Sequence, residues 1–248
     1  MKQILQKTIY LFSIIFLMSF GKMNATNYSF QGPGTDWYTS SNWLGGVMPT
    51  AGFINMGDVL DINSPCVFYQ FPTGNPIENF GIININSSLE CGVGTPALLN
   101  TSGIINISST GSISNSDIGN SQFGIINNNG NININSTTYH LWNYGTFNNN
   151  VGGTITNDGI FENTLFGIFD NFGTITNNST ILNDVNNTFT NSGIINNATT
   201  GTFTNEGTLN NQTLNGMFNN NGTVVNNNLG QIINSTSATF TNDFAADL

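Results

Sequence analysis

The feature that most constrains the fold is a repeat that keeps its phase over most of the chain. The stretch GTITNDGIFENTLFGIFDNFGTITNN, residues 153–178, is almost free of charge and returns to glycine every six or eight residues. If each repeat origin, usually a glycine, is numbered zero, position plus two is apolar in every repeat from Ile83 to Phe240. Disordered chains do not hold apolar residues at a fixed distance from their glycines, so the pattern indicates a solenoid.

Asparagine occupies a second regular position. Side chains two residues apart on a strand point to the same side, so the residues at plus two and plus four share one face, which we take as the interior. Stacked coils place Asn over Asn, where the amides hydrogen-bond along the stack. From Gly145 onward, position plus four is Asn in every repeat, which predicts a structural ladder of Asn149, Asn157, Asn163, Asn171, Asn177, Asn183, Asn191, Asn197, Asn205, Asn211, Asn220, Asn226, Asn234 and Asn242.

The repeat spacing predicts how the coil closes. Thr, Ile and Phe favour strands, whereas Gly and Asn favour bends and tolerate left-handed backbone, so each repeat is predicted to be a short strand and a corner. Three successive spacings usually sum to 20 or 22 residues, as in a three-sided coil, and two usually sum to 14, as in a flattened two-sided coil. We favour three sides because a flat coil has less room for interior Phe. The predicted fold class is all-β, a right-handed parallel β-helix (β-solenoid) with about 20–22 residues per coil and an N-terminal cap.

The N-terminus is typical of a secretory signal peptide. A short basic start is followed by the apolar stretch TIYLFSIIFLMSF (8–20) and by small and polar residues around Ala25. We therefore expect a signal peptide at 1–25, a cap and first strands at 26–80, and Asn/Gly-rich solenoid repeats at 81–248. The apolar run is shorter than the roughly 20 residues of a membrane span, so no span is expected in the mature chain, which is predicted to be secreted or held at the cell surface.

The charge distribution excludes one class of partner. All three basic residues (Lys2, Lys7 and Lys22) precede the expected cleavage site, and all 13 acidic residues follow it. Nucleic-acid binding depends on Lys and Arg that neutralise phosphates, so no nucleic-acid partner is expected. Without Lys or Arg to pair with its acids, the mature chain must be stabilised by apolar burial and hydrogen bonds.

Metal and disulfide chemistry have few candidates. Cys66 and Cys91 are the only cysteines, and an even pair in an exported chain predicts a disulfide rather than a metal site. His140 is the only histidine and cannot form a His-rich metal site alone. Asp58 and Asp61 lie close together without the alternating acids of a calcium loop. We expect no metal and no cofactor.

Catalysis also has few candidates. A glycoside hydrolase needs two carboxyl groups about 5–10 Å apart. Glu162 and Asp170 both occupy position plus three on successive strands, with Asp158 nearby. Scattered acids also serve solubility, so we expect no catalytic residue. A polysaccharide-active β-helix enzyme is kept as an alternative.

Pairs of outward-facing threonines indicate another alternative function, ice binding. T-x-T pairs at 154–156, 174–176, 188–190, 202–204 and 239–241 resemble the ice-binding faces of solenoid antifreeze proteins. In a coil of 14 residues the pairs beginning at 174, 188 and 202 would stack on one face, whereas in a coil of 20–22 residues they would not align. Exposed Thr also suits ordinary strands.

The segment before the repeats differs in composition. TDWYTSSNWLGGVMPTAGFINMGDVLDI (35–62) contains two Trp, a Pro and an acidic cluster. Its NWxGGxxP followed by GDVxxI resembles the opening segment of exported bacterial β-helix proteins. Trp37 and Trp43 are predicted to cover the first coil, with a sugar-stacking site as the alternative.

Together with the GTITN repeats, this segment makes the chain resemble bacterial surface adhesins of the haemagglutinin or autotransporter-like solenoid family. The resemblance implies a non-enzymatic extracellular module, adhesin-like or structural. Its partners would be glycans or surface proteins of host or neighbouring cells, bound through many weak hydrogen bonds. Family members commonly carry a C-terminal secretion or anchoring domain, and none follows ATFTNDFAADL here, so we expect a truncated product or a fragment of a longer protein.

Overall fold

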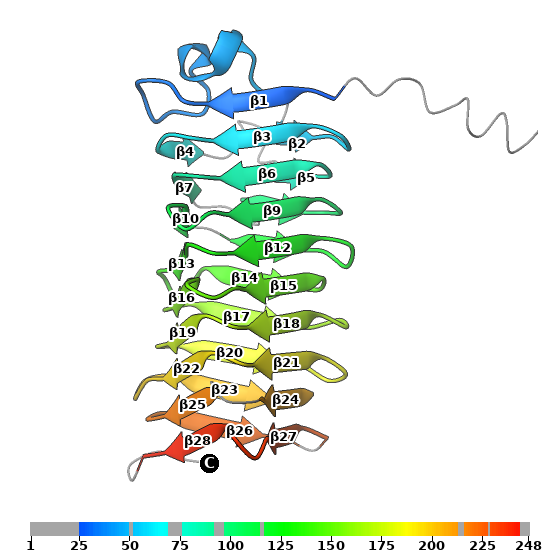
Figure 1. The fold of residues 1–248 in the computed structure, drawn as a ribbon, viewed down its shortest axis with the longest axis vertical. Helices are drawn as coiled ribbons and strands as arrows, with labels where there is room; N and C mark the ends of the chain where they lie inside the picture. Colours follow the sequence, from blue (N-terminus) through cyan, green and yellow to red (C-terminus); the bar gives the residue numbers. More distant parts are fainter. Residues whose placement is uncertain are drawn as a thin grey trace, which may run out of the picture.

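The chain winds as a right-handed, three-sided coil. A computed structural model describes residues 25–49, 52–68, 76–91, 97–114, 117–212, 216–227 and 229–243. Strands from successive coils stack into three parallel sheets of ten, nine and nine strands (Figure 1). The predicted β-solenoid is confirmed, and the two-sided coil is wrong. Except for Ala25, the predicted signal peptide lies outside the described residues.

Each sheet takes one strand from each coil. Sheet A contains β1 (Asn27–Phe30), β3 (Val59–Ile62), β6 (Ile82–Ile85), β9 (Ile104–Ile107), β12 (Ile125–Asn128), β15 (Thr146–Asn149), β18 (Ile168–Asn171), β21 (Thr188–Asn191), β24 (Thr208–Asn211) and β27 (Gln231–Asn234). Sheet B contains β4 (Cys66–Phe68), β7 (Ser88–Cys91), β10 (Ser112–Ser114), β13 (Asn131–Ile134), β16 (Thr154–Asn157), β19 (Thr174–Asn177), β22 (Ile194–Asn197), β25 (Met217–Asn220) and β28 (Thr239–Asn242). Sheet C contains β2 (Phe53–Ile54), β5 (Ile77–Asn79), β8 (Leu98–Asn100), β11 (Ile118–Asn120), β14 (His140–Asn143), β17 (Ile160–Asn163), β20 (Thr180–Asn183), β23 (Thr202–Asn205) and β26 (Thr223–Asn226).

The interior is filled by the apolar residues at position plus two. In most strands buried side chains alternate with half-buried ones, as expected when one face of a strand lines the core. The strand register places apolar residues of neighbouring coils above one another. In sheet A, Phe147, Phe169 and Phe189 stack in this way, with ring centroids 4.9 and 4.6 Å apart. The stacked residues therefore form continuous apolar columns along the solenoid axis.

The repeat glycines have a different role from the one expected. The glycines with left-handed backbone in the described residues are Gly45, Gly46, Gly52, Gly57 and Gly152, and none of them is a repeat origin. The origins are constrained by the neighbouring coil instead. A Cβ atom on Gly193, for example, would lie 2.1 Å from the carbonyl oxygen of Gly173. At the glycine origins the coils stack too closely for a side chain, whereas the origins Ser179, Asn187 and Ala238 carry one.

The N-terminal end is closed by a cap. Two 3-10 turns, η1 (Ser40–Asn42) and η2 (Leu44–Gly46), lie beyond β1 at the end of the solenoid (Figure 1). Trp37 packs edge-on against Trp43 and Phe68 at centroid distances of 4.8 and 5.2 Å, and Trp43 Nε1 donates to the Trp37 carbonyl at 2.7 Å. Both indoles are buried, so they cover the first coil and are not available to stack on a sugar.

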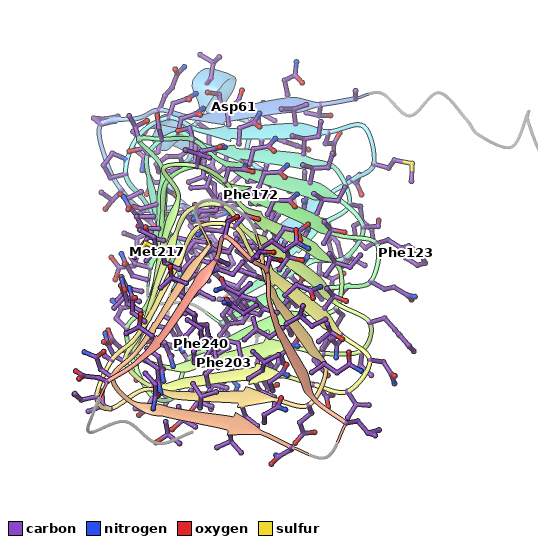
Figure 2. The ribbon with its side chains drawn as sticks, turned by 60° about the horizontal axis from the view of Figure 1, so that its bottom comes forward. Asp61, Phe123, Phe172, Phe203, Met217 and Phe240 are labelled. Atoms are coloured by element: carbon purple, nitrogen blue, oxygen red, sulfur yellow. The ribbon has the colours of Figure 1, made fainter. Side chains whose placement is uncertain are left out.

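The stacking of sheet A continues without a break from the cap into the repeats, because β3 pairs with β6. The boundary at residue 80 stays a prediction. At the other end, Ile232 and Phe240 occupy interior positions but are only partly buried. Figure 2 shows Phe203 and Phe240 inside the coil at this end, whereas Phe123 projects from the side.

Candidate functional site

Three columns of asparagine run along the interior, one where the strands of each sheet end. Side-chain amides of neighbouring rungs are joined by hydrogen bonds of 2.6–2.9 Å between residues 20 to 23 positions apart. The columns comprise Asn128, Asn149, Asn171, Asn191, Asn211 and Asn234 in sheet A; Asn157, Asn177, Asn197, Asn220 and Asn242 in sheet B; and Asn79, Asn100, Asn120, Asn143, Asn163, Asn183, Asn205 and Asn226 in sheet C.

Each rung also holds a corner of the coil. Asn157 Nδ2 donates to Asn177 Oδ1 at 2.7 Å and to the Thr180 carbonyl at 2.8 Å, and its Oδ1 accepts the Gly159 N–H at 3.2 Å. The side-chain amide therefore has hydrogen-bond partners for both its nitrogen and its oxygen, and it connects the end of one strand to the following coil. The contact with a backbone carbonyl also fixes which side-chain atom is nitrogen.

All fourteen asparagines of the predicted ladder lie in these columns. Sequence reasoning missed five earlier rungs, which are Asn79, Asn100, Asn120, Asn128 and Asn143. They precede Gly145, where repeat spacing is irregular and position plus four is often aliphatic. Asn128 could have been predicted from the sequence, because it lies at position plus four from Gly124.

A further ladder, also missed, lies on the outer face of sheet A. Side-chain amides of Asn84, Asn106, Asn127 and Asn148 each donate to the residue of the preceding coil, and the ladder ends at the Asp61 carboxylate, with distances of 2.8–3.0 Å. A carboxylate accepts and does not donate, so Asp61 sets the direction in which every amide of this ladder points. Figure 2 marks Asp61 near the capped end.

The candidate carboxylates of a hydrolase lie on different faces. Glu162 belongs to β17 in sheet C and Asp170 to β18 in sheet A, and both side chains point outward. Asp158 lies in a turn, where it accepts a hydrogen bond from Asn178 Nδ2 at 2.8 Å. The two carboxylates do not flank a common surface on which a glycosidic bond would sit between them.

His140 stacks on Trp142, with ring centroids 4.8 Å apart, on the outer face of sheet C. Its backbone N–H donates to Asp117 Oδ1 at 2.7 Å, which holds the start of β14 in place. At the following corner, burial and the nearby Glu162 carboxylate raise the pKa of Tyr144. These contacts support a structural role for the aromatic stretch.

The acidic pair near the cap is part of the fold. Asp58 accepts hydrogen bonds from the backbone N–H groups of Thr26 and Asn55 at 2.7 and 3.0 Å, and Asp61 ends the outer ladder. Among the described residues, no three His, Cys, Asp or Glu side chains come together as they would around a metal ion.

The two cysteines lie inside the coil on neighbouring strands. Cys66 in β4 is in register with Leu89, and Cys91 in β7 is in register with Phe68, so the cysteines are diagonal neighbours. Strand spacing and residue rise place diagonal Cα atoms about 8 Å apart, beyond the roughly 7 Å that a disulfide spans without backbone movement. Burial raises the pKa of the Cys66 thiol, and the nearby Cys91 and Asp36 raise it further. The disulfide stays a prediction.

The threonine pairs are divided among the sheets. The pairs 174–176, 188–190 and 202–204 lie in sheets B, A and C respectively, as expected for a three-sided coil. In sheet B the pairs 154–156 and 174–176 stack, but Ile194 and Asn196 follow them in register. A continuous Thr face of the ice-binding kind is therefore absent from the described coils.

No protein-family model and no curated protein matches the chain. Among solved structures, the chain is similar to a hyper-glycosylated TibA55-350 fragment whose glycosylation is catalysed by TibC, with 17% sequence identity over 76% of each chain and a TM-score of 0.29. A likeness this weak supports no conclusion about function. The helices in the described part of the chain are short, and none is a candidate for crossing a membrane.

Proposed function

We propose that the protein is a non-enzymatic, extracellular β-solenoid that acts as an adhesin-like or structural surface module. The observation that carries this proposal is the register of the outer faces. On sheet B, for example, Ser112, Asn131, Thr154 and Thr174 lie above one another on successive strands. A partner that hydrogen-bonds to one coil meets a similar group about 4.8 Å further along, so many weak contacts can add along the rod.

Two features favour this function over the alternatives. The titratable groups are scattered, with Glu162 and Asp170 on different sheets, whereas a polysaccharide-active enzyme needs them converging on one bond. The threonine pairs do not form a continuous face, whereas an ice-binding solenoid needs one. Export through the predicted signal peptide and display at the cell surface belong to the same proposal.

Three assays on the purified chain separate the functions. Beads coated with the protein should adhere to cells or bind spots on an array of neutral glycans and surface proteins. Release of reducing ends from polysaccharides would instead establish the enzyme, and thermal hysteresis would establish ice binding. Antibody labelling of intact cells tests surface display, which would be contradicted by signal only after the cells are lysed.

A further inference from the structure

Apolar side chains project along one corner of the solenoid, where the chain passes from sheet C to sheet A. We call the exposed residues in the turns of this corner the corner ridge: Met56, Phe123, Leu165, Phe166, Val185 and Leu229. Phe123, Leu165, Phe166 and Leu229 are 75%, 62%, 69% and 74% exposed. Figure 2 shows Phe123 projecting away from the coil. Large apolar side chains concentrated on one exposed line indicate an interaction surface.

One turn of the ridge exposes its residues at the cost of strain. In the turn 164–167, Gly167 N–H donates to the Thr164 carbonyl at 3.0 Å, and the central residues Leu165 and Phe166 have φ of 49° and 71°. Turns with positive φ at both central positions favour Asn and Gly, because other side chains are strained there. Here the two positions hold bulky apolar residues that are also exposed. Folding alone gives no reason for this choice.

The ridge residues recur along the axis, with gaps at the coils of β6, β9, β15 and β24. Its turns immediately precede β3, β12, β18, β21 and β27, all of which belong to sheet A. Phe123 and Leu229 precede β12 and β27, which are five strand steps apart, or about 24 Å. Thr164 Oγ1 donates to Asp184 Oδ2 at 2.7 Å and so joins the turn of Phe166 to that of Val185. A partner segment of similar length can contact the turns from Phe123 to Leu229.

The charges beside the ridge are negative. Asp184 and Glu206 lie in turns of the same corner, and Glu162 lies close to it, beside Tyr144. The described part of the chain contains no Lys or Arg, since all three lysines precede residue 25. A second copy of this chain would place carboxylates against carboxylates, and anionic lipid would be repelled. A partner with apolar and basic side chains is complementary in both respects.

We propose that the corner ridge is a docking surface for a basic, amphipathic segment of a partner protein. The apolar side of such a segment packs on Phe123, Leu165, Phe166 and Leu229, while its Lys or Arg residues lie beside the flanking carboxylates. This inference rests on the proposed function and assigns to it a surface and a class of partner.

The probe is a fluorescent 18-residue peptide of Leu and Lys arranged to form an amphipathic helix. The ridge variant carries Phe123→Ser, Leu165→Asn and Phe166→Gly; the last two changes suit the turn, so the variant should fold at least as stably as the wild type. The control variant carries Val151→Asn and Phe172→Ser, which remove exposed apolar side chains from a different corner. Neither variant changes a charge. Circular dichroism and the thermal midpoint verify folding.

The peptide should bind the wild type and the control variant with equal affinity, and this affinity should fall at high salt. Its affinity for the ridge variant should be lower by at least about tenfold. A matched peptide of Leu and Glu should not bind. Equal affinity for both variants would overturn the proposal. So would ridge-dependent binding to phosphatidylcholine vesicles without peptide binding, or ridge-dependent dimerisation in sedimentation, because the occupant would then be a lipid surface or a second copy.

Cell adhesion separates this inference from the proposed function. If beads coated with the ridge variant adhere to cells as well as wild-type beads do, the corner ridge is not the docking surface, although the protein is still adhesive. If wild-type beads adhere to nothing, the adhesive function itself fails, whatever the peptide does.

Discussion

A single interior asparagine connects three coils. Asn171 Oδ1 accepts from Asn149 Nδ2 at 2.7 Å, and its Nδ2 donates to Asn191 Oδ1 at 2.7 Å and to the Ile194 carbonyl at 3.2 Å. A buried amide is costly unless its hydrogen bonds are made, and here every partner comes from a neighbouring coil. The residue is therefore well suited to a stacked coil and poorly suited to an ordinary core.

Replacing Asn171 with Ala should lower the free energy of unfolding by about 3 kcal/mol, because it removes the amide, takes from Asn149 Nδ2 its shorter hydrogen bond and takes from Asn191 Oδ1 the hydrogen bond that Asn171 donates. Equilibrium unfolding in urea measures the loss. Asn133→Ala, on the outer face of β13, is the matched control and should cost little. An equal loss in both variants would contradict the structural role of the column.

Gly193→Ala should destabilise the protein by about 2–4 kcal/mol, because the new Cβ atom would lie 2.1 Å from the Gly173 oxygen and the coils would have to separate. The thermal midpoint reports the change. Ser179→Ala, at an equivalent repeat origin that already carries a Cβ atom, should be nearly neutral. If the glycine variant is as stable as the serine variant, close stacking is not the constraint.

Tyr38 gives the protein a dependence on alkaline pH. Burial and the Asp36 carboxylate raise its pKa from 10.0 to about 12, so the folded state disfavours the phenolate. The stability that comes from a neutral Tyr38 is complete below pH 10 and is lost as pH rises through about 12, because the unfolded chain ionises first. Unfolding midpoints measured from pH 9 upward should fall less steeply in Tyr38→Phe. Identical slopes would contradict the raised pKa.

At the scale of elements, the cap is what ends the stack at its N-terminal side. Trp37 and Trp43 close the first coil with buried, edge-on contacts, so the apolar columns do not meet solvent there. An open end of a solenoid presents unpaired strand edges and apolar side chains. The 3-10 turns and the two Trp therefore act as one unit.

Trp37→Ala should cost about 3–5 kcal/mol, since it leaves a cavity between the cap and the first coil. It should also increase binding of an apolar dye such as ANS and promote aggregation. Trp142→Ala, which loses the stacking on His140 on an outer face, is the control and should do neither. Comparable dye binding by both variants would show that the cap does not shield the core.

The sequence predicted the strands well because two positions, plus two and plus four, repeat the same physical requirement in each coil. Ile155 and Asn157 illustrate this, since both are buried, Ile155 lies between Ile132 and Ile175, and Asn157 stacks on Asn177. The outer ladder from Asp61 to Asn148 was not predictable in the same way, because outward residues meet only once the coil length is known. The turn at Leu165–Phe166 contradicts local preference, so propensity could not find it.

At the scale of the whole molecule, the coil is the unit that can be added or removed. Thr174 pairs with Thr154 above and with Ile194 below, so residues 174–193 form one complete coil. Most contacts of a coil are with its two neighbours, as in other solenoids. Stability should therefore change in steps of one coil.

Deletion of residues 174–193 joins Gly173 to Ile194 and should give a folded, shorter solenoid with similar circular dichroism per residue and modestly lower stability. Deletion of residues 174–186 removes part of a coil, moves interior side chains out of register and should prevent folding beyond that point. Limited proteolysis distinguishes the two. If both deletions fold equally well, the coil is not the unit of stability.

The direction of the asparagine columns has one further consequence. In all three columns Nδ2 points toward the C-terminal coils, and hydrogen bonds to backbone carbonyls such as those of Thr180 and Thr202 hold this orientation. Amide dipoles aligned in this way add together, as peptide dipoles do along a helix. The interior of the solenoid thus has an electrical polarity that its uniform appearance conceals: toward the cap the amides offer oxygen, and toward β28 they offer hydrogen.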